Sequence, residues 1–599
     1  MAWYFDRYEG RTPPAPVPHN PARELAYQTL AVAAMVLGAW YLWWRWTDSL
    51  NVKALWFAIP LVVAETLAYF GSLLFFLSIW RTRDTPVQPP PRTVNDILAV
   101  PLAQDRPLIV DVFFPTYNED VELVRLSIRD GKKMTYPHPI DLRIHALDDG
   151  RRPAMKKVAD EEGVGYITRT NNIGYKAGNM RNALEQTQGD VLVICDADTR
   201  PFPQMLERTL GYFRDPQVAW VQSPQWFYDL DEGTPLPKAL GRFLGPVGRG
   251  LGWVVEKVAG PIHLGRDPLA NDPQMFFDVI QRRRNWCNAS FCCGAGSLHR
   301  REAVMEAALK AYGAQVETAV APFTREVTDP RLRGDLAQAM SGEIARATEL
   351  TPYKFHVSED IYTSIVLHSD KERQWKSVFH PEVLSKMLSP QDLLAWTIQR
   401  FKYAGGTLDI FKNDNPLRLP GLSGWQKLMY GTTLYSYLAP LWTLVFLAAP
   451  ILYLFSGVAP VATYDAAFYS HLLPFLVINK LAFMVGTWGV NTYRGEQYYL
   501  GFFWLNLRAL WDVARGKTIK FHVTPKTREA KLFLNLVWPH LTVIGLTVLG
   551  LLVMGLRIMN GATNYLPPYV ANVFWSANNI FSLSAIVLAS VKKPVEDES

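Results

Sequence analysis

The sequence predicts an α/β domain with a mostly parallel sheet, inserted between the transmembrane helices of an integral membrane protein. Long, nearly uncharged apolar stretches occur only towards the two ends of the chain. Between them, strand-like and helix-like segments alternate at short spacing, and several of the strand-like segments end in carboxylates. Because ligands of open α/β sheets bind at the carboxyl ends of the strands, the sequence also predicts a binding site at that edge.

The composition agrees with a membrane protein that carries a polar domain. Hydrophobic residues make up 49% of the 599 positions, which is at the apolar limit for a soluble protein. The net charge of +6 comes without a basic helix or a recognised nucleic-acid-binding module, so nucleic acid is not an expected partner. The 4 cysteines lack the paired spacing of a zinc site, and we expect reduced thiols.

Six apolar stretches are long enough to cross a bilayer. Two precede the polar region and four follow it: 25–44, 54–80, 428–455, 472–490, 532–556 and 569–589. Lysine and arginine concentrate after the second stretch, in residues 494–531 and in the C-terminal tail, whereas residues 457–469 contain neither. The positive-inside rule therefore predicts that both termini and the polar domain are cytoplasmic.

These features divide the chain into segments of different character. We expect an N-terminal segment (1–24), two spans (25–80), a proline-rich linker (81–106), the α/β domain (107–387) with a helical or partly mobile insertion (315–353), amphipathic interface helices (388–424), two spans (425–490), an interface helix and loop (491–531), two spans (532–590) and a tail (591–599).

Carboxylates follow three of the expected strands, which are residues 108–114, 142–147 and 191–194. The carboxylates are Glu119, Asp148 with its neighbour Asp149, and Asp196 with Asp198. Asp196 and Asp198 lie two positions apart in an extended segment, so their side chains share a face and can approach one cation. Hard oxygen donors suit Mg²⁺ or Mn²⁺, especially when phosphate oxygens complete the coordination.

Further chemistry-bearing residues lie downstream of these strands. Lys176 stands beside a small turn that leads into a helix, which suits a diphosphate; a solvated lysine is the alternative. Glu359 and Asp360 open a helix, where acidic residues either cap the helix or serve as a general base. Residues 399–403 lie on an amphipathic segment before the third span, and such a segment also suits the membrane interface.

The order of these motifs resembles the processive family 2 glycosyltransferases, in particular the bacterial cellulose synthase catalytic subunit and its β-glucan synthase relatives. The motifs that carry the resemblance are Pro115–Glu119, Asp148, Lys176–Asn179, Asp196–Asp198, Gln222–Gln225, Phe291–Gly294, Ser358–Asp360, Gln399–Tyr403 and Phe521–Lys526. The last of these is similar to a gating loop that lies over the nucleotide pocket of cellulose synthase.

The resemblance implies a GT-A-type domain and a role for each motif. It implies Asp360, with Glu359, as the catalytic base and a metal site of Asp196 and Asp198. It implies a nucleotide-sugar site formed by Thr116, Glu119, Asp148, Lys176, Asp196, Gln399, Arg400 and Lys402. It implies acceptor contacts from Phe291, Cys293 and Tyr403, and a gating loop containing Phe521, Val523, Thr524 and Lys526.

Three departures from the cellulose synthase pattern bear on the glycosidic linkage. Lys402 and Tyr403 stand where the family has Arg-Trp, which removes a planar bidentate fork and part of an aromatic platform. Residues 315–353 lengthen the stretch before Asp360, and we expect no cyclic-di-GMP-binding barrel after the last span. These departures favour a sister glucan synthase of the curdlan (1,3-linked) or mixed-linkage type over a 1,4-linking enzyme.

The resemblance therefore implies an inverting enzyme of a bacterial inner membrane that polymerises glucose from UDP-glucose with Mg²⁺ or Mn²⁺. It would secrete the growing β-glucan through its own spans, with the lipid bilayer and accessory periplasmic or envelope export subunits as further partners. Two enzyme alternatives remain: a synthase of the hyaluronan or chitin type that uses UDP-GlcNAc, and a non-processive lipid-linked glycosyltransferase. A transporter or receptor with a nucleotide-sensing domain is the non-enzymatic alternative.

Overall fold

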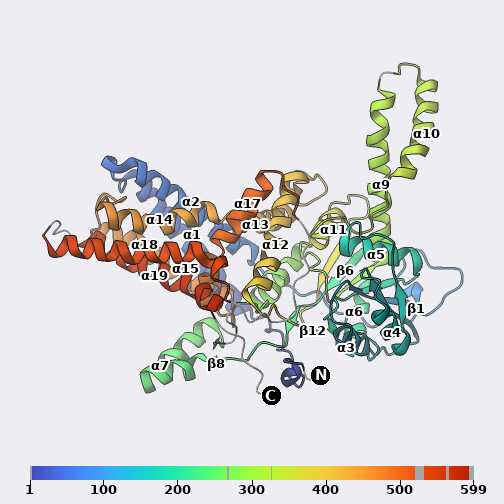
Figure 1. The fold of residues 1–599 in the computed structure, drawn as a ribbon, viewed down its shortest axis with the longest axis horizontal. Coiled ribbons are helices and arrows are strands. Elements are labelled where there is room, and N and C mark those ends of the chain that lie inside the picture. The colour runs from blue at the N-terminus through green and yellow to red at the C-terminus, as the bar shows by residue number, and fades with distance from the viewer. Residues whose placement is uncertain are drawn as a thin grey trace.

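The computed structural model describes residues 3–265, 267, 269–325, 327–519, 532–561 and 566–591. The four predicted gating-loop residues, Phe521, Val523, Thr524 and Lys526, lie outside these ranges. The described chain forms an α/β domain at one end and a bundle of long apolar helices at the other, with shorter helices between them (Figure 1).

The α/β domain is built on a seven-stranded sheet in the order β11-β6-β10-β4-β1-β2-β3. Its strands are β1 (Leu108–Thr116), β2 (Ile140–Asp148), β3 (Gly165–Ile167), β4 (Val191–Ile194), β6 (Val218–Gln222), β10 (Ser297–Arg300) and β11 (Lys376–Phe379). Every pairing is parallel except the two made by β10, which runs antiparallel to β4 and β6. The predicted mostly parallel sheet, inserted between apolar helices, is therefore confirmed.

Helices cover both faces of this sheet, which explains why β1 is buried at nearly every position. Val110, Val112 and Phe114 pack with α3 (Val121–Gly131), α4 (Pro153–Glu162) and α6 (Met205–Thr209). Phe113, which points to the opposite face, packs with α5 (Tyr175–Gln186) and α9 (Arg301–Thr324). The carboxyl ends of β1, β2 and β4 consequently open at one edge, between these helical layers.

Six helices are long and apolar enough to cross a membrane among the described residues. They are α1 (Pro21–Thr47), α2 (Leu55–Ser78), the broken pair α13 (Gly424–Tyr437) and α14 (Pro440–Ser456), α15 (Ala466–Gly486), α18 (Leu534–Met559) and α19 (Pro567–Val591). They lie side by side in Figure 1 and flank the α/β domain in sequence, so the chain is a membrane protein.

Shorter elements connect the sheet to the bundle. The helices are α7 (Leu236–Ala259), α8 (Arg282–Arg284), α11 (Glu359–His368), α12 (Leu393–Asn413), α16 (Thr492–Gly501) and α17 (Phe503–Ala514). Two small sheets contain β5 (Arg200–Pro201), β12 (Ser385–Met387) and β7 (Trp226–Phe227), and β8 (Thr234–Pro235) with β9 (His263–Leu264). The predicted insertion is helical: the end of α9 and α10 (Pro330–Ala347) form a hairpin that stands off the domain (Figure 1).

A buried ion pair joins the first two spans. The side chain of Arg45 in α1 is fully buried, and its Nε donates to Glu65 Oε2 in α2 at 2.7 Å. A second guanidinium nitrogen donates to Ser49 Oγ at 2.6 Å. Breaking a buried ion pair on one side is more costly than removing both partners, because one charge is left without a counter-charge.

We therefore predict that Arg45→Leu lowers the free energy of unfolding by about 3 kcal/mol. The double variant Arg45→Leu/Glu65→Leu should recover most of that loss, since no buried charge remains. Thermal unfolding in one detergent, compared across wild type, single and double variants, measures both effects. Equal instability of the single and double variants would contradict the pairing.

Candidate active site

A cleft of about 410 Å³ opens at the carboxyl ends of β1 and β4. It lies where the sheet edge meets α5, α11 and α12. The structure brings together in this cleft Thr116, Glu119, Lys176, Asp196, Asp198, Cys293, Glu359, Asp360, Gln399, Lys402 and Tyr403, all of which were predicted from the sequence as site residues. The cleft therefore gathers residues from segments that are nearly 300 positions apart.

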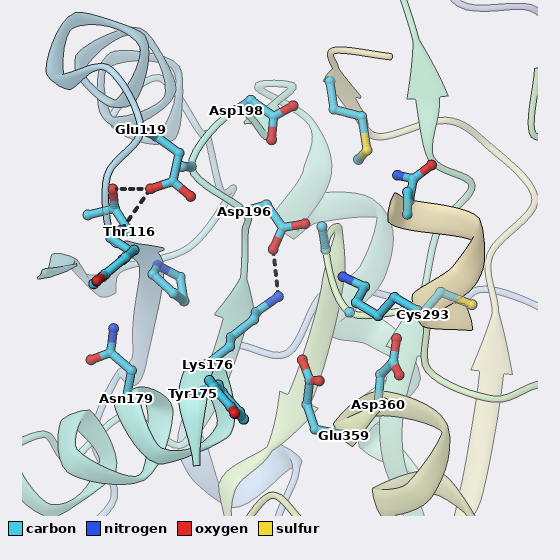
Figure 2. Close-up of a pocket in the computed structure, with 18 of the residues that line it drawn as sticks. Thr116, Glu119, Tyr175, Lys176, Asn179, Asp196, Asp198, Cys293, Glu359 and Asp360 are labelled. Atoms are coloured by element: carbon cyan, nitrogen blue, oxygen red, sulfur yellow. Dashed lines mark hydrogen bonds and ion pairs between the residues drawn. The ribbon is translucent and has the colours of Figure 1, made fainter. Parts of the chain in front are cut away.

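The end of β1 forms one wall through a short hydrogen-bonded turn. Thr116 Oγ1 donates to Glu119 Oε2 at 2.8 Å, and the backbone N–H of Tyr117 donates to the same oxygen at 2.7 Å (Figure 2). Arg152 donates to Thr116 Oγ1 at 2.8 Å. The side chain of Tyr117 is nearly half exposed and lines the cleft, where it offers a ring face to a planar base.

Asp148 lies behind this wall and does not line the cleft. Its carboxylate is fully buried and accepts hydrogen bonds from the backbone N–H groups of Gly150 and Arg152, from Arg152 Nε and from the Tyr166 hydroxyl. Because these hydrogen bonds occupy its oxygens, Asp148 holds the turn after β2 in place. Its predicted direct contact with the nucleotide stays a prediction that this geometry does not favour.

The neighbouring Asp149, for which the sequence predicted no separate role, does line the cleft. Its two oxygens accept from Arg169 Nε and an Arg169 terminal nitrogen at 2.6 and 2.7 Å. Asn179 also lines the cleft: its amide nitrogen donates to Leu147 O, while its buried Oδ1 has no hydrogen-bond partner in the described structure. An unsatisfied buried acceptor beside a cleft is available to a ligand donor, and sequence alone does not reveal it.

Lys176 forms the electrostatic centre of the cleft. Its Nζ donates to Asp196 Oδ1 at 2.6 Å, which joins the start of α5 to the end of β4 (Figure 2). Burial opposes the charged form, but the negative charges of Asp196, Glu359 and Asp360 outweigh it and raise the pKa of Lys176 above its ordinary value. Lys176 is thus a cation at neutral pH, as a diphosphate contact requires.

Glu359 and Asp360 open α11 and face the same space in Figure 2. Burial, with the adjacent charge of Asp360, raises the pKa of Glu359 to about 7. Burial also raises the pKa of Asp360, while the cations Lys176 and Lys402 act against that rise. Raised carboxyl pKa values in a cleft are typical of general bases that work near neutral pH.

Gly294 leaves room between the cation and this pair of acids. It has φ +82°, and a Cβ at this position would lie 3.6 Å from Lys176 Nζ and 3.7 Å from Asp360 Oδ2. The loop that carries Gly294 is held by Gln222, whose Oε1 accepts from the Cys293 N–H at 2.8 Å, and by Gln225, whose amide donates to Cys293 O. The predicted Gln222–Gln225 element therefore positions the loop beside Asp360.

A second cavity of about 430 Å³ adjoins the first and is lined mainly by α12, α13, α16 and residues 263–277. The two cavities share Gln225, Phe227, Cys293, Ser358, Asp360, Gln399 and Tyr403. Phe291 and Arg400, predicted for the acceptor and the nucleotide respectively, line this second cavity and not the cleft. Its walls also include Thr433 and Tyr437 from the span helix α13, and Asn491 and Tyr498 from the cap and body of α16.

Two carboxylates are available to a divalent cation. Asp196 and Asp198 both line the cleft, and Asp198 Oδ2 accepts from the backbone N–H of Leu388 at 3.1 Å. The described residues contain no group of three or more acidic, histidine or cysteine side chains arranged as a complete metal site. The donor set therefore fits Mg²⁺ or Mn²⁺ only as a two-carboxylate site that substrate oxygens complete.

Comparison with known proteins identifies the class of this chain. Residues 111–307 match the model of glycosyl transferase family 2, and residues 270–490 match that of glycosyl transferase family group 2. Together these matches cover the sheet, the cleft and the first helices after it. With its six apolar helices, the chain therefore resembles the membrane-embedded family 2 glycosyltransferases.

Within that class the chain resembles the cellulose synthase catalytic subunits. It is 27% identical to the UDP-forming catalytic subunit of Pseudomonas fluorescens over 96% of this chain and 68% of that protein. It is 29% identical to cellulose synthase 1 of Komagataeibacter xylinus over 76% of this chain, but only 24% of that protein. The structure is also similar to a mannosyltransferase of Pyrobaculum calidifontis solved with GDP-Man and Mn²⁺, with 14% identity, a TM-score of 0.43, and coverage of 76% of this chain and 99% of that one.

We predict that Asp148→Asn acts on stability and not on nucleotide binding. It should lower the free energy of unfolding by about 3 kcal/mol, because the partly buried Arg152 loses the charge of its fully buried partner. UDP affinity, measured by calorimetry well below the unfolding temperature, should change by less than about threefold. The matched variant Asp149→Asn, which lines the cleft, should weaken UDP binding; the reverse pattern would restore Asp148 as a ligand residue.

Proposed function

We propose that the chain is a processive, inverting β-glucosyltransferase that polymerises glucose from UDP-glucose into a linear β-glucan. One observation carries the proposal: the cleft and the second cavity meet at Asp360 and Tyr403. A nucleotide sugar in the cleft and a polymer end in the second cavity would therefore meet at a carboxylate suited to act as a base.

In the proposed reaction, Asp360 removes the proton from the acceptor hydroxyl. That oxygen attacks the anomeric carbon of the donor as the bond to the diphosphate breaks, so the configuration inverts and UDP leaves with the bonding electrons. Glu359, with its pKa near 7, holds a proton over part of the physiological range, which limits repulsion of the diphosphate. The acceptor oxygen then approaches one face of the anomeric carbon while the diphosphate leaves from the other.

The leaving diphosphate needs positive charge nearby. Lys176 supplies a buried cation in the cleft, and Lys402 on α12 supplies a second one whose pKa is lowered by burial. A divalent cation held by Asp196 and Asp198 would act as a Lewis acid on the diphosphate oxygens. These groups together lower the energy of the negative charge that develops on UDP.

The second cavity suits a chain of sugar rings. Its walls carry the aromatic side chains Phe276, Phe291, Tyr437, Tyr498 and Phe502. Aromatic faces pack against the apolar faces of pyranose rings without fixing one register, so a polymer can advance along them. These aromatic walls support secretion of the product through the helical bundle. The proposal also includes a bacterial inner membrane with the catalytic domain on its cytoplasmic side. Its further parts are a gating loop at residues 521–526 and accessory export subunits.

The linkage depends on how Tyr403 and Lys402 orient the acceptor. The relatives bear the name cellulose synthase, which supports a 1,4-linked product. The replacement of the family's Arg-Trp by Lys402-Tyr403 supports a different acceptor angle, and so a curdlan-type or mixed linkage.

Purified enzyme in lipid vesicles with UDP-glucose and Mg²⁺ tests the function. We expect a long insoluble glucan and one UDP released per glucose incorporated, and linkage-specific β-glucanases then identify the bond. A product of one or two sugars would overturn processivity, and turnover of UDP-GlcNAc alone would overturn the donor assignment.

The variant Asp360→Asn tests the base. We expect UDP release to fall at least about 100-fold, because no group remains to accept the acceptor proton. UDP binding, measured by calorimetry, should stay within a few-fold of wild type, which excludes misfolding. Retained turnover in this variant would remove Asp360 from that role.

Lys402 should set the acid limb of the pH–rate profile. Its positive charge opposes the burial-induced rise in the pKa of Asp360. Lys402→Met removes that charge, so the carboxylate should hold its proton longer and the acid limb should move to higher pH by roughly one pH unit. Lys402→Arg keeps the charge and should leave the limb in place; a profile for Lys402→Met that coincides with wild type would contradict this coupling.

A further inference from the structure

Helix α7 is a hairpin of two short helices. At Gly245 the backbone has φ +59° and ψ −140°, which is not helical, and Pro246 follows directly. The arms, residues 236–244 and 246–259, run antiparallel, and β8 pairs with β9 at their base. The segment contains none of the motifs on which the family resemblance rests.

Glycines let the two arms pack at backbone distance. A Cβ on Gly248 would lie 2.3 Å from the carbonyl oxygen of Leu240, and one on Gly252 would lie 2.6 Å from Pro237 Cα. Small residues at such a contact are typical of helices that associate within lipid, where close packing replaces the hydrophobic effect as the source of stability. The hairpin is therefore built as a compact unit.

The tip of the hairpin exposes large apolar side chains. Phe243 is 85% exposed and Val247 is 69% exposed. Four more apolar side chains on the two arms are each more than half exposed: Leu244, Leu251, Trp253 and Val254. An apolar patch of this kind is unfavourable in water and indicates a surface that has an apolar partner.

The base of the hairpin is fixed at the end of a span. Leu236, Ala259 and Ile262 form an apolar cluster that contacts Met484, two residues from the end of α15. In Figure 1 the hairpin stands at the side of the helical bundle, apart from the seven-stranded sheet. Its apolar tip therefore extends from the point where α15 leaves the apolar region.

Basic residues flank the exposed apolar side chains. The segment carries Lys238, Arg242, Arg249 and Lys257 against a single acid, Glu256. Lys257 Nζ lies 4.9 Å from the centre of the Trp253 ring, an arrangement that places a cation and an indole together. Tryptophan and basic side chains in this combination are typical of segments at an anionic bilayer surface.

We propose that residues 234–264 form a re-entrant hairpin that inserts its tip into the nearer leaflet of an anionic phospholipid bilayer. At 1.5 Å per residue, the shorter arm is about 13 Å long, which is less than half of a hydrocarbon core about 30 Å thick. The hairpin therefore enters and leaves on one side, and the long cationic side chains reach back to the headgroup phosphates.

Depth-dependent fluorescence quenching tests the insertion. The full-length protein carries Leu244→Cys, labelled with an environment-sensitive dye, in single-copy nanodiscs of phosphatidylcholine and phosphatidylglycerol. The matched control is Leu332→Cys on α10, because Leu244 and Leu332 are 57% and 59% exposed respectively. Signal from wild-type protein corrects for labelling of the partly accessible Cys287 and Cys293.

We expect nitroxide-bearing lipids to quench the dye at position 244, and aqueous iodide to quench it about fivefold less than at position 332. Equal iodide quenching at the two positions would overturn the proposal. Protection at 244 from both quenchers would also overturn it, since a protein partner or a second copy would then cover the tip.

A second variant tests the lipid charge. Nitroxide quenching at position 244 should be stronger with phosphatidylglycerol than with phosphatidylcholine alone. Arg242→Gln/Arg249→Gln should abolish that difference, because the tip loses its cationic contacts. A difference that survives in this variant would overturn the role of the two arginines.

Discussion

The ion pair between Lys176 and Asp196 is the interaction on which the arrangement of the site depends. It joins α5 to the end of β4 at 2.6 Å and holds a buried cation among three carboxylates. Without Lys176, the negative charges of Asp196, Glu359 and Asp360 would repel one another across the cleft. The lysine therefore allows acids with different proposed roles to stand within one cleft.

This charge balance also constrains the donor. Lys176 and Lys402 lie among Asp196, Glu359 and Asp360 and offset part of their negative charge, and a bound diphosphate would add more. A divalent cation that arrives with the diphosphate restores the balance, which is the physical reason for pairing the proposed donor with Mg²⁺ or Mn²⁺. The raised pKa of Glu359 also reduces the negative charge of the cleft, because a protonated carboxyl group is neutral.

The features that could be predicted from the sequence are those that local residue patterns determine. Apolar runs such as Val191–Ile194 identify buried strands, and their carboxyl ends locate Asp196 and Asp198 at the functional edge of the sheet. The antiparallel insertion of β10 between β4 and β6 has no local signal, because a short buried strand reads the same in either direction. Sequence also does not show which of the adjacent residues Asp148 and Asp149 lines the cleft. That depends on which carboxylate is enclosed by hydrogen-bond donors in the folded structure.

The α7 hairpin and the second cavity depend on packing between segments that are distant in sequence. One stretch of chain connects the hairpin to the site. The chain that leaves the hairpin through β9 continues into residues 263–277, many of which line the second cavity. A hairpin fixed in one leaflet would therefore hold this wall at a constant depth relative to the bilayer. Asp360 and Tyr403, at the inner end of the same cavity, would then keep a fixed distance from the spans while a polymer moves past them. Membrane attachment of a segment remote from the reacting atoms would thus help to align the proposed acceptor path with the donor cleft.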